Sequence, residues 1–353
     1  MKDYSRSWSH GIHAVALGGG TGLANLLRGL KGRLNSRYPH IVAPAVPNSA
    51  FIKDLAAIVA MTDDGGSSGR LRKAFGMPPP GDLRNCMIAL SDDDNLFSHL
   101  FQHRFSDCTG GLGDHSLGNL CIAALSQMTG DFLEAVELAC ELLAVRGRIL
   151  PVTAANSTLI ARLLDGSYVV GETALASSSL PITEVAIDPP NSFAVPAALD
   201  AIASADLVTV GPGSLYTSLI ATLLVEGITD ALVSTSATRV YIANLMTQPN
   251  ESLGLTLSEH IERIYEHARR PMFDYALVNT APIPDRMLNC YSAQGAQPVI
   301  ADLERIERMG IRCITGDFIA KTGNVVRHSP ELLAAALVNL PFFLQSPRTS
   351  PVC

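Results

Sequence analysis

The sequence has few charged residues and no cluster of basic ones. Of its 353 residues 17% are charged, with 26 Lys and Arg against 33 Asp and Glu, giving a formal net charge of −7. An average soluble protein has about 25% charged residues, so this chain is apolar for a globular protein. A general nucleic-acid-binding protein presents clustered Lys and Arg to the phosphate backbone, and no run of them occurs here. We therefore expect no nucleic-acid partner, and an anionic ligand would need local positive potential.

Paired cysteines and targeting segments are absent too. The seven cysteines form neither a CxxC pair nor a zinc-site spacing, which is typical of small apolar core residues in a reducing compartment. Residues 1–11 lack the apolar segment of a signal peptide. The long uncharged stretch from Leu207 to Val225 contains glycines, a proline and several hydroxyl residues, which favour a strand, loop and helix over a membrane span. We expect a cytoplasmic protein without membrane contact.

The order of apolar runs predicts a mostly parallel α/β sheet. Runs at residues 12–17, 56–61 and 207–210 each lead into a glycine-rich segment, and further buried strands are predicted at 231–234, 240–244 and 276–279. Near-continuous apolar strands that alternate with helices indicate a parallel sheet with helices on both faces. Although the length allows about two domains, this pattern favours one large α/β domain.

The middle of the chain differs from both ends. Helical spacing predicts helices at residues 86–90, 95–101, 117–128 and 132–145. β-branched runs within residues 149–187 indicate a small β-rich insertion in the same domain. A late hairpin is predicted at residues 316–327. The domain is placed at residues 12–345, between a flexible N-terminus (1–11) and a tail (346–353).

Polar clusters follow several of the predicted strands. Ligands of open α/β sheets bind outside the carboxyl ends of the strands, so we expect the clusters to converge on one cleft. In GGGTG, at residues 18–22, glycines allow backbone N–H groups to approach a ligand closely, and the following helix offers its positive end. A phosphate is the expected partner, and a merely tight strand-to-helix turn is the alternative. The predicted contacts are Gly19, Gly20, Thr21 and Gly22.

Two adjacent carboxylates, Asp63 and Asp64, follow the second predicted strand. Such neighbours repel each other unless a metal, an arginine or a donor-rich ligand compensates them. They are therefore predicted to bind Mg²⁺ or to accept hydrogen bonds from a ribose or base. The alternative is that one aspartate caps the next helix while the other is solvated.

Two further polar segments precede apolar helices. Asn85 follows a triple proline, and His115 and Asn119 lie where the helix predicted from residue 117 begins. Ligand contact is predicted for all three, with helix capping, or a satisfied core histidine for His115, as an equal alternative. His99 and His103 have the spacing of a chelating pair on one helix face, but the apolar residues around them favour a structural role.

A second glycine loop and an amide-rich strand end complete the predicted site. GPGS, at residues 211–214, follows one strand, and Gln248 belongs to the polar end of another. Two glycine loops suit a diphosphate or a nucleotide with a second moiety, each helix end contributing about 0.3 to 2 kcal/mol. Neither GxSxG nor GxGxxG occurs at these loops, which disfavours a hydrolase nucleophile and a nicotinamide site. The predicted contacts are Gly211, Gly213, Ser214, Asn244 and Thr247.

A series of segments between residues 12 and 326 resembles the CofD-like family: GGGTG, TDDGGSSGRLR, PPPGDLRN, LFQHRF, HSLGNL, VRGRILP, GPGSLYTS and NLMTQPNES. They are most similar to its gluconeogenesis-factor (YvcK-type) branch. The resemblance implies a Rossmann-like, doubly wound fold and a cytoplasmic bacterial protein that binds UDP-sugars, notably UDP-N-acetylglucosamine. It also implies a role linked to central carbon metabolism, cell shape and the cell envelope, without an established reaction.

The enzymatic branch of the family, 2-phospho-L-lactate transferase, implies the alternative function. That enzyme moves a phosphorylated three-carbon acid from a GMP-linked donor to a deazaflavin hydroxyl with Mg²⁺, and its acidic segment matches Asp63 and Asp64. The continuation GGSSGRLRKAFGMPPPGDLRN follows the gluconeogenesis-factor branch instead. We therefore predict a nucleotide-sugar-binding regulator without catalytic residues, and allow for Mg²⁺ as a cofactor and for a homodimer.

Overall fold

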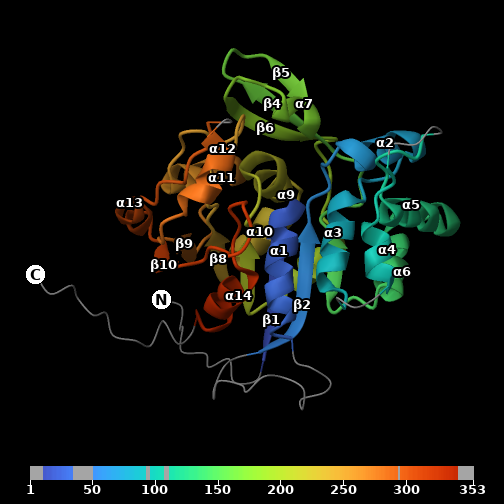
Figure 1. Cartoon of the computed structure of the whole chain (residues 1–353), viewed down its shortest axis with the longest axis horizontal. Helices are drawn as coiled ribbons and strands as arrows, with labels where there is room; N and C mark the ends of the chain where they lie inside the picture. The colour runs from blue at the N-terminus through green and yellow to red at the C-terminus, as the bar shows by residue number, and fades with distance from the viewer. Residues whose placement is uncertain (1–10, 35–50, 93–95, 107–110, 293–294, 341–353) are drawn as a thin grey trace, which may run out of the picture.

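A seven-stranded parallel sheet forms the centre of the molecule (Figure 1). The computed structural model describes residues 11–34, 51–92, 96–106, 111–292 and 295–340. The sheet has the strand order β10-β9-β8-β7-β1-β2-β3, and every neighbouring pair is parallel. Its strands are β1 (Ile12–Gly18), β2 (Ile52–Val59), β3 (Arg148–Pro151), β7 (Leu207–Val210), β8 (Thr238–Ile242), β9 (Tyr275–Asn279) and β10 (Arg312–Gly316).

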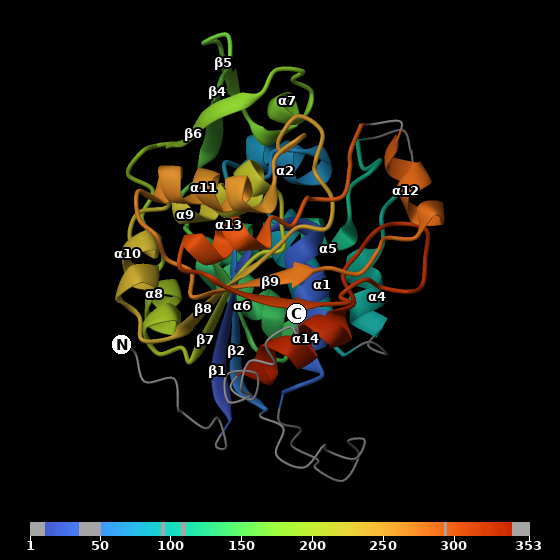
Figure 2. The ribbon, with the colours of Figure 1, turned by 90° about the vertical axis from the view of Figure 1, so that its left-hand side faces the viewer.

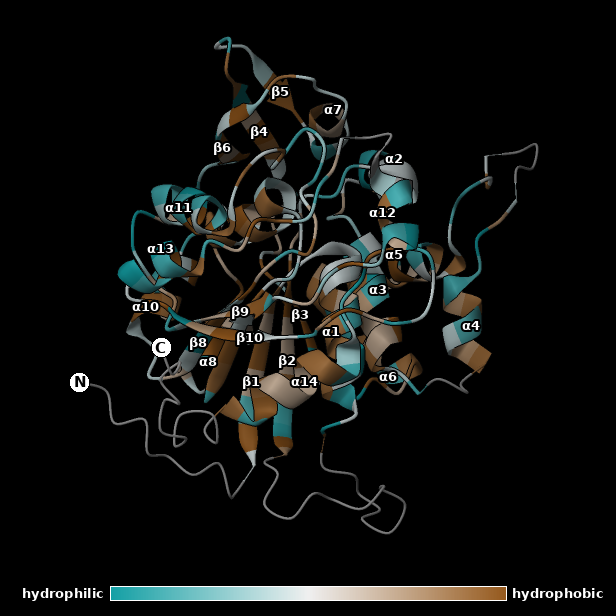
Figure 3. Cartoon of the chain, turned by 60° about the vertical axis from the view of Figure 1, so that its left-hand side comes forward, coloured by the Kyte–Doolittle hydropathy of each residue, from teal (hydrophilic) through white to brown (hydrophobic). Residues whose placement is uncertain are grey.

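The central strands are apolar because helices cover both of their faces. All four residues of β7 are buried, as are the last five of β1 and of β2. Figure 3 shows this apolar centre between helices with polar outer faces. α1 (Gly20–Lys31) is typical: it buries Leu23, Leu26, Leu27 and Leu30, the spacing of one helix face. The predicted parallel sheet covered on both faces is confirmed.

The strand order reverses next to β1. The chain builds β1, β2 and β3 in one direction, returns to the other side of β1 with β7, and continues outward through β8, β9 and β10. Open α/β sheets bind ligands at such a switch point, outside the carboxyl ends of the strands. The loops that follow β1 and β7 are the two glycine loops, so the topology places them side by side.

Helices lie on both faces of the sheet (Figure 2). On one face α1 packs against α3 (Gly81–Leu90) and α14 (Pro330–Val338), and on the other α8 (Pro196–Ala203) packs against α10 (Ile228–Ser234). The remaining elements of the main body are α2 (Gly66–Phe75), α4 (Leu96–Gln102), α5 (Leu117–Thr129), α6 (Phe132–Leu142), the π-helical segment η1 (Leu215–Ile220), α9 (Ala221–Leu223), α11 (Leu257–Ala268), α12 (Asp285–Ser292) and α13 (Leu303–Arg308).

A small antiparallel sheet lies above the carboxyl edge of the main sheet (Figure 1). Its order is β5-β4-β6, formed by β4 (Thr158–Leu163), β5 (Tyr168–Val170) and β6 (Ile182–Asp188), with α7 (Glu172–Ala176) between β5 and β6. Alternating burial along β4 shows that one face of this sheet packs inward. The structure thus contains the predicted β-rich insertion, but β4 begins at residue 158 rather than 149.

Three of the predicted elements need correction. Residues 149–151 belong to β3, the edge strand of the main sheet, where they pair with β2. Residues 231–234 are the end of α10, because Ile228 and Leu232 bury one helical face. The predicted hairpin at 316–327 is a single antiparallel bridge between Ile319 and His328, since Gly316 ends β10. Residues 1–10 and 346–353, predicted to be a flexible terminus and a tail, lie outside the described residues.

The described part of the chain contains no helix long and apolar enough to cross a membrane. The uncharged stretch at residues 207–225 folds as β7, a loop, η1 and α9, as its glycines and hydroxyl residues predict. Cys86, Cys121, Cys140 and Cys313 have free thiols, with Cys86 buried and the other three half-buried.

Candidate functional site

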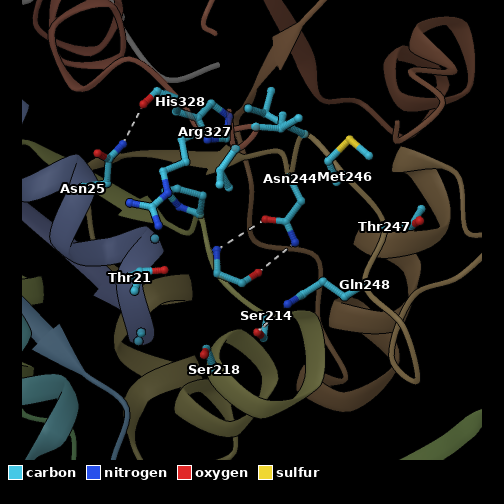
Figure 4. Close-up of a pocket in the computed structure, with 18 of the residues that line it drawn as sticks. Thr21, Asn25, Ser214, Ser218, Asn244, Met246, Thr247, Gln248, Arg327 and His328 are labelled. Atoms are coloured by element: carbon cyan, nitrogen blue, oxygen red, sulfur yellow. Dashed lines mark hydrogen bonds between the residues drawn. The ribbon is translucent and has the colours of Figure 1, made fainter. Parts of the chain in front are cut away.

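A cleft of about 390 Å³ opens at the carboxyl ends of β1, β7 and β8 (Figure 4). Both glycine loops line it, together with residues 244–249 after β8, Tyr291 of α12 and residues 325–328. We call it the glycine-loop cleft. It is lined by many of the predicted contacts: Gly19, Gly20, Thr21, Gly22, Gly213, Ser214, Asn244 and Thr247.

The two glycine loops approach each other closely at Gly22. A Cβ atom on Gly22 would lie 2.4 Å from the carbonyl oxygen of Pro212, so no larger residue fits without moving the backbone. Gly211 does not line the cleft, although ligand contact was predicted for it. Its N–H instead donates to the carbonyl oxygen of Leu17 at 3.0 Å, which joins the second loop to the end of β1.

A carboxylate occupies one of the backbone N–H donors at the start of α1. The Gly20 N–H donates to Asp82 Oδ2 at 2.5 Å. Burial and the nearby charge of Asp63 raise the pKa of Asp82 to about 6. Among the described residues the Thr21 and Gly22 N–H groups have no hydrogen-bond acceptor. These two donors, at the positive end of a 12-residue helix, remain available to an anion.

The strand end after β8 is fixed by its own side chains. Asn244 forms two hydrogen bonds with Gly213: its Nδ2 donates to the Gly213 carbonyl at 2.8 Å and its Oδ1 accepts from the Gly213 N–H at 3.3 Å (Figure 4). Thr247 Oγ1 accepts from the Gln297 N–H at 2.9 Å. Both residues therefore shape the cleft, and their side chains already have protein partners.

Gln248 keeps one polar atom unpaired at the same edge. Its Nε2 donates to Ser214 Oγ at 2.9 Å, whereas its Oε1 is buried and has no hydrogen-bond partner among the described residues. A buried acceptor without a donor costs free energy. Gln248 Oε1 is therefore the amide oxygen best placed to accept from a ligand.

Several residues of the cleft were missed by the sequence reasoning. Arg327 and His328 also line the cleft, and Asn25 Nδ2 donates to the His328 carbonyl at 2.8 Å (Figure 4). Burial lowers the pKa of His328 to about 4, so this side chain is neutral near pH 7. Arg327 is the only Lys or Arg among the described residues that line the cleft. It carries no recognisable motif, and more than 300 positions separate it from the first glycine loop.

Asp63 and Asp64 do not line the glycine-loop cleft. Asp64 Oδ1 accepts from the backbone N–H of Thr173 at 2.8 Å and from its hydroxyl at 2.7 Å. A Cβ on Gly171 would lie 1.9 Å from Asp64 Oδ2, so only glycine allows this approach. Asp63 Oδ1 accepts from the Gly65 N–H at 2.9 Å. Asp64 thus attaches α7 of the insertion to the end of β2.

Further carboxylates surround this attachment. Burial, together with the nearby charges of Asp63 and Asp82, raises the pKa of Glu172 to about 8. Glu251 accepts from the Tyr216 N–H and the Thr217 hydroxyl, both at 3.0 Å, at the start of η1. Burial also raises the pKa of Glu251. We call Asp63, Asp64, Asp82, Glu172 and Glu251 the acidic cluster.

The acidic cluster does not form a metal centre by itself. Asp64 Oδ1 is occupied by Thr173, and the described residues contain no group of three or more His, Cys, Asp or Glu that could hold a metal ion. His99 and His103, which have the spacing of a chelating pair, are therefore not part of such a group either. Mg²⁺ at Asp63 and Asp64 stays a prediction. Two carboxylates do not complete the coordination of Mg²⁺, so a bound substrate or water molecules would have to supply the other ligands.

The half-buried Asn85 and the buried His115 and Asn119 belong to a separate hydrogen-bond network. Ser67 Oγ lies 2.9 Å from His115 Nδ1 and accepts from Asn119 Nδ2 at 3.1 Å. Arg84 donates to Asn85 Oδ1 at 2.7 Å and to Asn119 Oδ1 at 3.2 Å. Burial lowers the pKa of His115. These contacts join α2, α3 and α5, so the three residues lie outside the glycine-loop cleft and have protein partners.

The chain matches a family model described as 2-phospho-L-lactate transferase CofD over residues 14–319. It is 41% identical to the gluconeogenesis factor of Bacillus subtilis, covering 92% of this chain and 96% of the relative. The gluconeogenesis factor of Halalkalibacterium halodurans is 38% identical, covering 96% and 98%. A crystal structure of a Bacillus halodurans protein has a TM-score of 0.85 and 38% identity, covering 93% of this chain and 99% of that one.

These matches show that the chain belongs to the CofD family. The resemblance predicted from the sequence motifs is therefore confirmed, and so is the fold class. The named relatives in that comparison are gluconeogenesis factors.

Proposed function

We propose that this protein binds a nucleotide-linked sugar, a UDP-sugar such as UDP-N-acetylglucosamine, in the glycine-loop cleft and acts as a regulator. One observation carries the proposal: two glycine loops from the two strands at the switch point line a single cleft. A nucleotide diphosphate has two anionic groups and polar groups on either side of them. The cleft offers backbone donors and Arg327 for the anion, and hydroxyl and amide groups around it.

The local chemistry accommodates an anion in a chain of net charge −7. Thr21, Gly22 and Arg327 all line this cleft, and Figure 4 shows the Arg327 side chain on the same side of the cleft as Asn25 and Thr21 of α1. Four of the five carboxylates of the acidic cluster, those of Asp63, Asp64, Asp82 and Glu251, accept hydrogen bonds from protein groups at Gly20, Gly65, Thr173, Tyr216 and Thr217. The positive potential that the ligand needs is therefore provided by a few groups at one edge of the sheet.

The regulated process is proposed from the relatives. Two relatives that cover more than nine-tenths of this chain are named gluconeogenesis factor. We propose the same role in central carbon metabolism, exerted in the cytoplasm, with the bound nucleotide-sugar as its signal. Links to cell shape and the envelope belong to the same proposal, because UDP-sugars are envelope precursors.

Isothermal titration calorimetry of the full chain with UDP-N-acetylglucosamine tests the proposal. Arg327→Ala should weaken binding about tenfold, because a charge-assisted contact to the diphosphate is lost. Lys321→Ala is the matched control: it removes one positive charge from the same segment, but Lys321 pairs with Asp317 at 3.6 Å and does not line the cleft. Its affinity should equal that of the wild type.

Two outcomes would contradict the proposal. One is a correctly folded wild type that binds none of a panel of UDP- and GDP-linked compounds. The other is turnover: the family model is described as a transferase, so the protein should also be incubated with Mg²⁺, a deazaflavin and a GMP-linked donor. A phosphorylated product found by mass spectrometry, and lost in Asp63→Asn, would make the protein an enzyme of the transferase type.

A further inference from the structure

A second cavity adjoins the glycine-loop cleft. It encloses about 370 Å³ at the carboxyl ends of β8 and β9, and it shares Asn244 and Leu245 with the cleft. No charged side chain occurs among the described residues that line it. We call this cavity the uncharged slot. Its size is at the lower end of the range of about 300 to 1,000 Å³ that is usual for small-molecule sites.

The walls of the uncharged slot are tied to the cleft by backbone hydrogen bonds. The Val299 N–H donates to the Leu245 carbonyl at 3.1 Å, and the Thr247 N–H donates to the Gln297 carbonyl at 2.7 Å. Pro282 and Pro298 stiffen the two facing segments. The slot is therefore preformed, and a ligand that enters it need not order the chain.

The side chains of the two asparagines that line the slot already have hydrogen-bond partners within the protein. Asn279 Nδ2 donates to the Ala281 carbonyl at 2.8 Å, and its Oδ1 accepts from the Phe318 N–H at 2.9 Å. The Asn244 amide is held by Gly213. Thr280 adds the one remaining side-chain hydroxyl, while the other walls are aliphatic, such as Val278 and Ala301.

These walls exclude two parts of a nucleotide-sugar. A phosphate would lose its hydration without gaining a cation, and a sugar would bury several hydroxyl groups without partners. A flat heterocycle has apolar faces and few polar edge atoms, so it fits an aliphatic slot with one hydroxyl group. The third part of the ligand, its base, thus matches the slot in chemistry.

We propose that the uncharged slot binds the base of the nucleotide, while the glycine-loop cleft holds the diphosphate and the sugar. The proposal rests on the proposed function, since it places the base of the same ligand. Asn244 and Leu245 belong to both cavities, so a single ligand passes from one to the other along this strand end.

Two substitutions fill the slot from different walls. Ala301→Leu and Ala281→Leu each add bulk where a half-buried alanine lines the cavity. Calorimetry with UDP and with UDP-N-acetylglucosamine should show affinity at least about tenfold lower for both variants. Affinity for inorganic pyrophosphate, which has no base, should stay within about twofold of the wild type. In saturation-transfer NMR of the wild type, the base protons of UDP should receive more magnetisation than the ribose protons.

Ala124→Leu, the same change at an exposed position of α5, is the control and should bind every probe as the wild type does. Thermal unfolding and circular dichroism verify that each variant is folded. Two results would overturn the assignment of the base to the slot while leaving the proposed function standing. One is unchanged UDP affinity in both folded slot variants, and the other is a loss of pyrophosphate affinity as large as the loss of UDP affinity. A wild type that binds none of the three probes would instead overturn the proposed function, and the slot with it.

Discussion

The glycine-loop cleft and the acidic cluster lie at the same edge of one sheet, yet they use their polar groups in opposite ways. The cleft leaves the Thr21 and Gly22 N–H groups and Gln248 Oε1 without described protein partners. In the acidic cluster, Asp64 holds Thr173 and Glu251 holds the start of η1. The two open donors and the open acceptor of the cleft are available to a ligand, whereas the bonded oxygen atoms of Asp64 and Glu251 stabilise the fold.

The comparison shows that a carboxylate of an adjacent pair can also have a partner within the protein, which the sequence alone does not reveal. Asp63 and Asp64 suggest a metal or ribose site because adjacent charges need compensation. In the structure Asp64 accepts hydrogen bonds from Thr173, more than 100 positions away in the insertion, and the charge of Arg72 acts on both aspartates. The capping alternative was thus nearer to the observed contact, although the capped helix is α7 and not α2.

The largest effect is expected where the two loops meet. Gly22→Ala should abolish detectable UDP-N-acetylglucosamine binding, because its Cβ would lie 2.4 Å from the Pro212 carbonyl oxygen and force the loops apart. It should also lower the free energy of unfolding by about 1 to 3 kcal/mol. Calorimetry and chemical denaturation measure the two effects. Gly32→Ala, near the other end of α1, has ordinary φ and should change neither. Wild-type binding by Gly22→Ala would show that the close approach is dispensable.

A smaller effect is expected at the attachment of the insertion. Asp64→Ala removes both hydrogen bonds to Thr173, so α7 should exchange its amide hydrogens faster and the free energy of unfolding should fall by about 1 kcal/mol. Asp165→Ala, which breaks only a local turn at Ser167, is the control and should leave α7 protected. If Asp64→Ala instead abolished ligand binding while α7 stayed protected from exchange, Asp64 would be a ligand contact. The contrast between a ligand-binding cleft and a structural acidic cluster would then be wrong.

The smallest effect is a dependence of stability on pH. The pKa of Glu172 is raised to about 8, so between about pH 4.5 and 8 the folded protein keeps a proton that the unfolded chain releases. This group therefore lowers stability as pH rises through that window. Glu172→Gln should melt like the wild type near pH 4.5 and about 1 to 3 °C higher at pH 8. The exposed Glu184→Gln should show no such trend, and parallel melting curves for Glu172→Gln would refute the shift.

The parts of the fold that follow local rules could be predicted. Apolar runs predicted most strands of the main sheet, and glycine-rich segments after β1 and β7 marked the switch point. Residues 231–234 were mistaken for a strand because a short apolar run fits either a buried strand or a helix. Residues 149–151 were assigned to the insertion because β-branched composition does not tell to which sheet a strand belongs.

The sequence by itself determined the fold class and one side of the site. Strand periodicity requires a covered parallel sheet, and glycines after two strands require backbone donors at its carboxyl edge. Tertiary structure alone decided that Arg327 lines the same cleft as these donors and that Asp64 holds the insertion. The physical reason is that the conformation of a glycine loop, and so the direction of its backbone N–H groups, depends mainly on residues next to it in the chain. The partner of a charged side chain depends on which distant segments the packing brings within hydrogen-bonding distance.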